Sequence, residues 1–388
     1  MLSYFFTTLA VFPDSLTDRI AHLPGLKEIR RRGFDVRFKE HTECQPIYEL
    51  FRLLSLKMNL KKLTRHEIGL FSTDRIIQRL DKKIAERLKR GNFPDIKAVY
   101  SYEDGAMNTF MTAKSIGLKN IYDLPIGYWR SAREFLQFEK QRWPEWASTI
   151  TGFKDSEVKL NRKDFEIELA DVIMVASSFT ASTLENFPGP EKKIHIIPYG
   201  FPPVHEGIRD YYDGKKRKLK LLFVGGLTQR KGIADVFEAV KQFSNDVSLT
   251  IVGQKTTHEC KALDSCLKKY NYIPTLSNQR ILELMRTHDV LLFPSLFEGF
   301  GLVITEAMSQ GMPVITTNRT AGPDIIDHNK NGWLINAADT RVLIAAIKYL
   351  LDNPHAVEEN GQNALHTAKQ RPWNVYGQML AEELKSEI

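Results

Sequence analysis

Two glutamates lie eight positions apart in the segment "FEGFGLVITEA" (297–307), with a pair of glycines between them. The preceding run "DVLLFPS" (289–295) has the length and apolar composition of a buried strand, and "GLVITEAMSQG" (301–311) favours a short helix. Glu298 therefore falls in a loop after a strand, and Glu306 falls roughly one turn into a helix. Because a helix rises about 1.5 Å per residue, the two carboxylates should lie several ångströms apart and hold different parts of one ligand.

The glycines of this loop, Gly299 and Gly301, remove side chains where the N–H groups of the helix start can point at a ligand. Those donors and the helix dipole favour phosphate. Carboxylates repel phosphate, so the two glutamates should address hydroxyl groups. A nucleotide sugar, with a diphosphate between a sugar and a ribose, fits this pattern. The alternative is an ordinary strand-turn-helix with its glutamates in solvent.

A second glycine loop, "FVGGLTQRKGI" (223–233), also follows an expected strand and precedes an expected helix. Gly225 and Gly226 allow close backbone approach, and Arg230 and Lys231 supply two positive groups suited to a diphosphate. A solvated Arg-Lys pair is the alternative, but cations are disfavoured at a helix start unless an anion is present. The loop is neither a Walker A sequence nor a G-x-G-x-x-G motif, which argues against a nicotinamide enzyme.

The chain has 388 residues, 43% of them hydrophobic, which favours two domains. Continuous apolar runs alternate with helical patterns, which predicts an α/β architecture of doubly wound parallel sheets with ligands at the carboxyl ends of the strands. We expect domains at 1–205 and 206–370, divided near a polar segment, and a closing helix over 371–388. The expected strands are 97–102, 120–126, 171–178, 219–226, 247–254, 289–295 and 313–317.

No apolar stretch reaches the roughly 18–20 residues that span a bilayer. Three cysteines without paired spacing indicate a reducing compartment, with neither disulfides nor structural zinc. The start, "MLSYFFTTLAVF", lacks the positive region of a secretory signal, so we interpret it as a buried first strand. These observations predict a soluble, cytoplasmic protein.

The net charge of +7 comes from one region, since residues 51–100 hold 13 Lys/Arg against 5 Asp/Glu. Segment 51–66 has leucines at helical spacing with basic residues on its other faces. It is either a core helix with a solvated face or a helix on an acidic surface, such as the inner face of a membrane or an acidic acceptor. Nucleic acid is not expected, because no recognisable module is present. The spaced leucines are Leu53, Leu56, Leu60 and Leu63.

Most of residues 170–385 resembles the family-4 retaining glycosyltransferases of the GT-B fold, in which two Rossmann-like domains face each other across a cleft. The resemblance rests on "ADVIMVASSFTASTL", "IHIIPYGF", "FVGGLTQRKGI", "DVLLFPSLFEGFGLVITEAMSQGMPVITT" and "RPWNVYGQML". Glu298 and Glu306 match the E-x7-E element of that family. The N-terminal half matches in general architecture only.

The resemblance implies an N-terminal acceptor-binding domain and a C-terminal nucleotide-sugar-binding domain. Glu298 would contact the donor sugar and Glu306 the ribose, while Arg230 and Lys231 would neutralise the leaving diphosphate. Glu298, Lys231 and Arg230 are thus the implied catalytic residues. The remaining implied donor-binding residues are Gly225, Gly226, Tyr272 and Ile273 for the diphosphate and base, and Gly299, Phe300, Gly301 and Leu302 for the sugar and phosphate.

Two departures from the family pattern concern the diphosphate loop and the N-terminal half. Gly225-Gly226 stands where the family commonly has Gly-Arg, so Arg230 would supply the guanidinium. The family's N-terminal histidine has no counterpart, because no histidine occurs between His66 and His195. A buried Asp123–Arg130 pair is the structural alternative at this place, and the aromatic segment 128–147 is either core packing or a stacking platform for an acceptor sugar. The acceptor-side candidates are Glu103, Asp104, Asp123, Tyr128 and Arg130.

The expected activity is retaining transfer of a sugar from a UDP-, GDP-, ADP- or dTDP-linked donor to a glycan, lipid-linked or small-molecule acceptor. The setting would be cell-surface polysaccharide or glycoconjugate synthesis. A nucleotide-sugar epimerase of the same fold and a nucleotide-binding module without catalysis are the alternatives. No cofactor or metal is expected, since similar enzymes need none and no D-x-D motif occurs.

Overall fold

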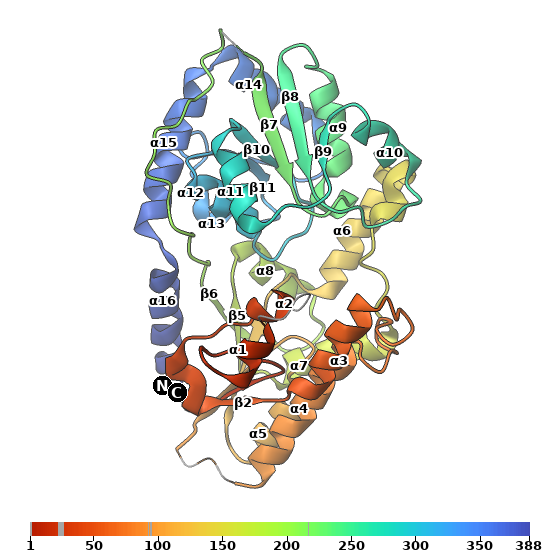
Figure 1. Ribbon diagram of the computed structural model, residues 1–388, viewed down its shortest axis with the longest axis vertical. Helices are drawn as coiled ribbons and strands as arrows, with labels where there is room; N and C mark the ends of the chain where they lie inside the picture. The colour runs from red at the N-terminus through yellow and green to blue at the C-terminus, as the bar shows by residue number, and fades with distance from the viewer. Residues whose placement is uncertain (1, 22–26, 92, 94, 216) are drawn as a thin grey trace.

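The computed structural model describes residues 2–21, 27–91, 93, 95–215 and 217–388. Two parallel sheets form the two halves of the molecule, one above the other in Figure 1. The N-terminal sheet has four strands in the order β3-β4-β5-β6, and the C-terminal sheet has six in the order β12-β11-β10-β7-β8-β9. This architecture confirms the predicted α/β fold of two Rossmann-like halves.

Every expected strand is present. Burial explains why the sequence predicted them well, because all residues of β5, β10 and β11 are buried and such strands have continuous apolar runs. The strands are β3 (Ala98–Tyr102), β4 (Lys119–Leu124), β5 (Val172–Val175), β6 (Lys193–Ile196), β7 (Leu219–Val224), β8 (Val247–Val252), β9 (Asn271–Ile273), β10 (Val290–Phe293), β11 (Val314–Thr317) and β12 (Trp333–Ile335).

Helices cover both faces of the C-terminal sheet. In β7, Leu221 and Phe223 face one core with α9 and α14, while Leu222 and Val224 face another with α12 and α15. This alternation follows from the two-residue period of a strand. The helices of this half are α9 (Ile233–Lys241), α10 (Lys261–Leu267), α11 (Asn278–Arg286), α12 (Leu302–Ser309), α13 (Gly322–Ile325), α14 (Thr340–Asp352) and α15 (His355–Gln370).

The N-terminal sheet is covered on one face by α5 and α7 and on the other by the last helix of the chain. α16 (Trp373–Ser386) begins directly after Pro372 and packs Tyr376 and Leu380 against Ile121 and Met174. Figure 1 shows α15 and α16 running along one side of both halves. The other helices are α1 (Leu16–Ala21), α2 (Lys27–Arg30), α3 (Pro46–Lys57), α4 (Thr73–Lys89), α5 (Met107–Ser115), α6 (Trp129–Arg142), α7 (Glu157–Leu169) and α8 (Ser178–Thr183).

The start of the chain departs from the prediction of a buried first strand. β1 (Phe5–Thr7) is short and half-buried, and it pairs with β2 (Thr42–Cys44) in a separate parallel sheet. The fully buried residues of this region come after the strand, at 9–12. The apolar residues at the start of the chain therefore belong to a small local core rather than to one buried strand.

The interpretation of 51–66 as a core helix with a solvated face is confirmed in part only, since Leu53 packs against a small core but the helix is shorter and more exposed than expected. α3 ends at Lys57, and Leu56 and Leu60 are 51% and 40% exposed. The inward side of α3 explains this exposure. Buried Glu49 forms ion pairs there with Arg32 and Arg52, and these pairs fix which side of the helix faces the protein. In the described part of the chain, no helix is both long and apolar enough to span a bilayer.

Candidate active site

The two glycine loops predicted from the sequence lie side by side. β7 and β10 are parallel neighbours, so the loops that follow them emerge at one edge of the sheet. The carbonyl oxygen of Arg230 accepts hydrogen bonds from the N–H of Leu296 at 2.8 Å and from the hydroxyl of Ser295 at 3.2 Å. At Gly232, where φ is 70°, a Cβ atom would overlap the carbonyl oxygen of Pro294. The loops thus form one structural unit.

Arg230, Lys231 and Glu298 meet at this edge. The ammonium of Lys231 contacts the carboxylate of Glu298, and Nη1 of Arg230 lies 3.4 Å from the same carboxylate oxygen. Arg230 also donates to the carbonyl oxygen of Phe297 at 2.7 Å. Burial and the positive charge of Arg230 lower the pKa of Lys231, whereas the contact with Glu298 favours its charged form. Two largely buried cations with one carboxylate partner form a site that can accept a further anion.

The start of α12 points into the same region. Gly301 caps this helix in the left-handed conformation (φ 91°) and makes no side-chain hydrogen bond to its N–H groups. Phe300 is buried and packs on the ring of Tyr199, with ring centroids 4.9 Å apart, whereas Leu302 is exposed. The backbone at 300–302 is therefore anchored from behind, and an uncapped helix start favours an anion.

Glu306 lies about one turn along α12 and has different partners from Glu298. Its carboxylate accepts a hydrogen bond from Nδ2 of Asn278 at 2.7 Å, and burial raises its pKa. Tyr272 and Ile273 lie half-buried on β9, at the far edge of the sheet from β12. The two glutamates thus occupy separate places, as their spacing predicted. Asn278 is a site residue that the sequence analysis missed, because a polar residue at a helix start has no distinguishing pattern.

Three glycines of the site have different roles. Ideal Cβ atoms on Gly225 and Gly226 would meet nothing closer than 3.9 Å, so the space beside this pair is open. At Gly299, a Cβ atom would instead overlap the carbonyl oxygen of Pro125 in the N-terminal half. The predicted room for a ligand at Gly299 is thus filled by the opposite half of the protein.

Hydrogen bonds hold the same loop against the N-terminal half. The carbonyl oxygen of Gly299 accepts from Oγ of Ser177 at 2.5 Å and from Oγ1 of Thr180 at 2.9 Å. Gly127 packs against Phe297, whose ring a Cβ atom at position 127 would overlap. Contacts between the halves therefore determine the position of Glu298.

A cavity of about 230 Å³ lies between the two halves beside the cationic loop. Arg230 and Phe297 contribute its wall from the C-terminal half. Glu103 lines the opposite side and forms an ion pair with Lys163 at 2.8 Å. Burial raises the pKa of Glu103 to about 7, although Lys163 opposes the change. The other polar or aromatic residues that line the cavity are Trp129, Arg133, Asp155 and Lys163.

The other acceptor-side candidates do not line this cavity. Asp104 lies 3.4 Å from both Lys159 and Lys163. Buried Tyr128 donates to Asp164 at 2.6 Å, and the guanidinium of Arg130 pairs with the same carboxylate at 2.5 Å. Among the five candidates, the structure brings Glu103 alone into a cavity shared with Arg230.

The predicted Asp123–Arg130 pair is wrong. Asp123 accepts a hydrogen bond from the hydroxyl of Tyr100 and lines a separate cavity of about 10 Å³ next to α16. Burial raises its pKa to about 6. Asp123 and Ile121 are two positions apart on β4, so both face α16, whereas Arg130 packs against α7. The two residues are close in sequence but lie on different sides of the sheet.

The aromatic segment 128–147 contributes both to the core and to the wall of the cavity. Tyr128 and Trp146 are buried core residues, and the Trp146 ring stacks on Phe237 at 5.7 Å between centroids. Trp129 instead lines the cavity, with the guanidinium groups of Arg130 and Arg133 at 4.3 and 4.9 Å from its ring. Its position between core and cavity could not be assigned from the sequence pattern.

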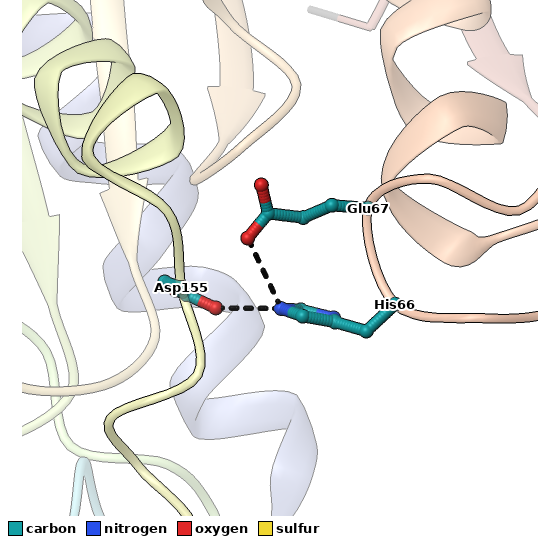
Figure 2. Close-up of side chains that lie close together, drawn as sticks. All are labelled: His66, Glu67 and Asp155. Atoms are coloured by element: carbon teal, nitrogen blue, oxygen red, sulfur yellow. Dashed lines mark hydrogen bonds and ion pairs between the residues drawn. The ribbon is translucent and has the colours of Figure 1, made fainter.

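A cluster of His66, Glu67 and Asp155 lies at the rim of this cavity (Figure 2). Nε2 of His66 lies 2.8 Å from Asp155 and 3.4 Å from Glu67, and the three potential ligand atoms all lie within 4.8 Å of one another. Both carboxylates also have protein partners, since Glu67 accepts from the N–H of Ser156 at 2.8 Å and Asp155 lies 3.4 Å from Lys159. We interpret the cluster as a tie between the segment after α3 and the start of α7.

The sequence of residues 206–367 matches the family described as "Glycosyl transferases group 1". The chain is 29% identical over 174 residues to the amylovoran biosynthesis glycosyltransferase AmsK of Erwinia amylovora, covering 41% of this chain and 42% of AmsK. It is 24% identical over 261 residues to the capsular polysaccharide biosynthesis glycosyltransferase CapM of Staphylococcus aureus, covering 61% of this chain and 66% of CapM. The matches therefore span less than two thirds of these relatives.

A solved structure matches over the full length of both chains. The crystal structure of HepE from Anabaena, in complex with UDP and glucose, superposes with a TM-score of 0.62 and 16% sequence identity, covering 100% of each chain. At this identity the likeness shows a shared fold.

Proposed function

Since residues 206–367 match the group 1 glycosyl transferases and the chain has the GT-B fold, we propose that it transfers a sugar from a nucleotide-sugar donor to an acceptor hydroxyl with retention of anomeric configuration. The observation that carries the proposal is the meeting of Arg230, Lys231 and Glu298 at the start of α12, beside a cavity lined by both halves. Cations suit the diphosphate, and the carboxylate suits sugar hydroxyls.

The first step is an exchange of ion-pair partners. A diphosphate that reaches Arg230 and Lys231 replaces Glu298 as their partner, because it brings more negative charge to the same place. The freed carboxylate then accepts hydrogen bonds from sugar hydroxyls. When the bond between the sugar and the diphosphate breaks, negative charge grows on the leaving group, and the two cations stabilise it in place.

Retention requires the acceptor to approach from the side on which the diphosphate leaves. The interdomain cavity supports this geometry, because Arg230 belongs both to the cationic loop and to the cavity wall. Trp129 offers an aromatic surface for a sugar ring, and Glu103 offers a carboxylate for an acceptor hydroxyl. The proposal includes transfer without a bound metal, since two protein cations face the leaving diphosphate. Equal rates with and without EDTA would support this part of it.

The comparisons suggest where to look for substrates. HepE holds UDP and glucose, so UDP-sugars are the first donors to test, followed by GDP-, ADP- and dTDP-sugars. The names of AmsK and CapM refer to the synthesis of amylovoran and capsular polysaccharide. We place this protein in polysaccharide or glycoconjugate synthesis, with a glycan or lipid-linked acceptor.

A thermal-shift screen of nucleoside diphosphates and their sugars tests the donor site, because a ligand that binds the folded state raises its apparent stability. The stabilising donor is then incubated with candidate acceptors, and the product linkage is determined by NMR. Retained configuration supports the proposal. Stabilisation by none of the nucleotides, an inverted linkage, or an epimerised sugar formed without acceptor would each contradict it.

The raised pKa of Glu103 leads us to expect that the rate of sugar transfer depends on pH. Burial raises its pKa to about 7, and only its ionised form accepts a hydrogen bond from an acceptor hydroxyl strongly. The rate should therefore increase as the pH rises through about 7. Glu103→Gln should abolish this rise and lower kcat/KM for the acceptor by about 10- to 100-fold, the loss expected for one charge-assisted hydrogen bond.

The control for Glu103 is Glu157→Gln, which alters an exposed carboxylate 3.4 Å from the cavity residue Arg133. This variant should keep the pH profile and the acceptor kinetics of the wild type. The donor affinity of both variants, measured by calorimetry, should be unchanged. A Glu103→Gln enzyme with the wild-type pH profile would exclude Glu103 from the acceptor step.

A further inference from the structure

An apolar surface extends over the outward side of α3 and the segment that follows it. We call this set the α3 surface, and its members are between 40% and 64% exposed. α3 lies on the outer side of the N-terminal half (Figure 1). The members are Ile47, Tyr48, Phe51, Leu54, Leu56, Met58, Leu60, Ile68 and Leu70.

Contacts on the inward side of α3 fix the orientation that exposes its apolar residues. Leu50 and Leu53 pack against a small core that contains Leu9 and Ile29, and the buried carboxylate of Glu49 pairs with Arg32 at 2.5 Å and with Arg52 at 2.6 Å. An ordinary surface helix presents polar residues to water, whereas α3 presents Phe51 and Leu54. Contiguous apolar exposure of this kind marks an interaction site.

Four exposed cations accompany the apolar residues: Lys57, Lys61, Lys62 and Arg65. The sequence has no acidic residue from 50 to 66. Among the residues that the structure describes, no ion pair links these four cations to a carboxylate. A second copy of the chain would place like charges face to face, whereas an anionic bilayer offers both apolar depth and negative charge.

The α3 surface leads to the rim of the interdomain cavity. His66 and Glu67 follow its basic residues directly. His66 contacts Asp155, as Figure 2 shows, and Glu67 accepts a hydrogen bond from the N–H of Ser156. Asp155 itself lines the cavity. These contacts connect the α3 surface to the wall of the cavity.

We infer that the α3 surface docks on the surface of an anionic lipid bilayer. The apolar side chains enter the interfacial region, and the four cations lie at the level of the lipid phosphates. Docking itself does not depend on catalysis. If the proposed function holds, docking also brings the acceptor cavity to the membrane, where a lipid-linked acceptor would present its hydroxyl group.

Flotation of the full chain with lipid vesicles tests the inference. Wild-type protein should float with vesicles of equal parts phosphatidylcholine and phosphatidylglycerol, and not with pure phosphatidylcholine. Reversal of three charges (Lys57→Glu, Lys61→Glu, Lys62→Glu) should lower the partition coefficient by roughly 100-fold, from the attraction expected for each cation near an anionic surface. Phe51→Ser with Leu54→Ser should lower it at unchanged net charge.

Matched controls come from the C-terminal half. Lys241→Glu with Lys348→Glu changes two exposed lysines, and Tyr349→Ser removes an exposed aromatic ring. These variants should bind vesicles like the wild type. Circular dichroism verifies the fold of every variant, and the salt dependence of wild-type flotation gives a readout that needs no variant, since binding should weaken as salt increases.

Three outcomes would overturn the inference: no flotation of wild-type protein with anionic vesicles, equal flotation with neutral vesicles, or equal loss of binding in the control variants. A dimer in sedimentation velocity that the Phe51→Ser, Leu54→Ser variant dissociates, without vesicle binding by the wild type, would assign the surface to a second copy. Flotation of the Glu298→Gln variant separates docking from catalysis, because that variant should still float.

Discussion

Glu298→Gln should lower kcat by about 100- to 1000-fold while affinity for the free nucleoside diphosphate stays equal or increases. The substitution keeps the shape of the side chain but removes the charge that accepts hydrogen bonds from sugar hydroxyls. Arg230 and Lys231 lose a competing carboxylate, so both remain available to the diphosphate. Single-turnover rates with the donor and calorimetry with the nucleoside diphosphate measure the two effects separately.

A control for this experiment is Glu283→Gln on α11, where a half-buried glutamate pairs with Arg280. It should leave both measurements unchanged. Unchanged turnover of Glu298→Gln would remove Glu298 from the mechanism. A parallel loss of diphosphate affinity would instead make Glu298 a structural support of the cationic loop.

Lys231→Met should weaken binding of the nucleoside diphosphate by about 10- to 100-fold, the range expected for one hydrogen bond between charged groups. The ammonium of Lys231 lies 4.8 Å from the centre of the Phe293 ring, and methionine keeps an apolar side chain of similar length there, so the fold should tolerate the change. Affinity for the nucleoside without phosphates should not change, because Lys231 addresses the diphosphate alone. Calorimetry with both ligands gives this comparison directly.

Lys241→Met on α9 is the matched control, since its ammonium is largely exposed and lies 3.8 Å from Glu238. It should bind the diphosphate like the wild type, and the diphosphate should raise its melting temperature to the same extent. Equal affinity of the Lys231→Met and wild-type proteins would exclude Lys231 from the donor site.

The meeting of the two glycine loops was predictable because it depends on local order. Each cationic or acidic residue follows a buried strand directly, and a buried parallel strand has a continuous apolar sequence. Once β7 and β10 are recognised as parallel strands, their carboxyl ends must lie on the same edge of the sheet. The meeting of Arg230 and Lys231 with Glu298 follows from that geometry.

The cavity between the halves was not predictable because it depends on how the halves pack. The close approach of Gly299 to Pro125 joins positions far apart in the chain, and the cavity beside it exists only between the halves. A pair of Asp123 with Arg130 was one alternative, but Asp123 faces α16 from β4 whereas Arg130 on α6 pairs with Asp164 of α7. For α3, the leucine spacing predicted a helix, and the partners of Glu49 decided which side faces outward.

The position of α16 determines when the N-terminal half can complete its fold during synthesis. The strands of the N-terminal sheet leave the ribosome early. Their residues Ile121, Val172 and Met174, however, pack against a helix that begins only at Trp373. At translation rates of about 5–20 residues per second, the nascent sheet would wait roughly 10–35 s after β6 for this helix. During that time it exposes an apolar face that chaperones can bind. The half that is made first is therefore completed last.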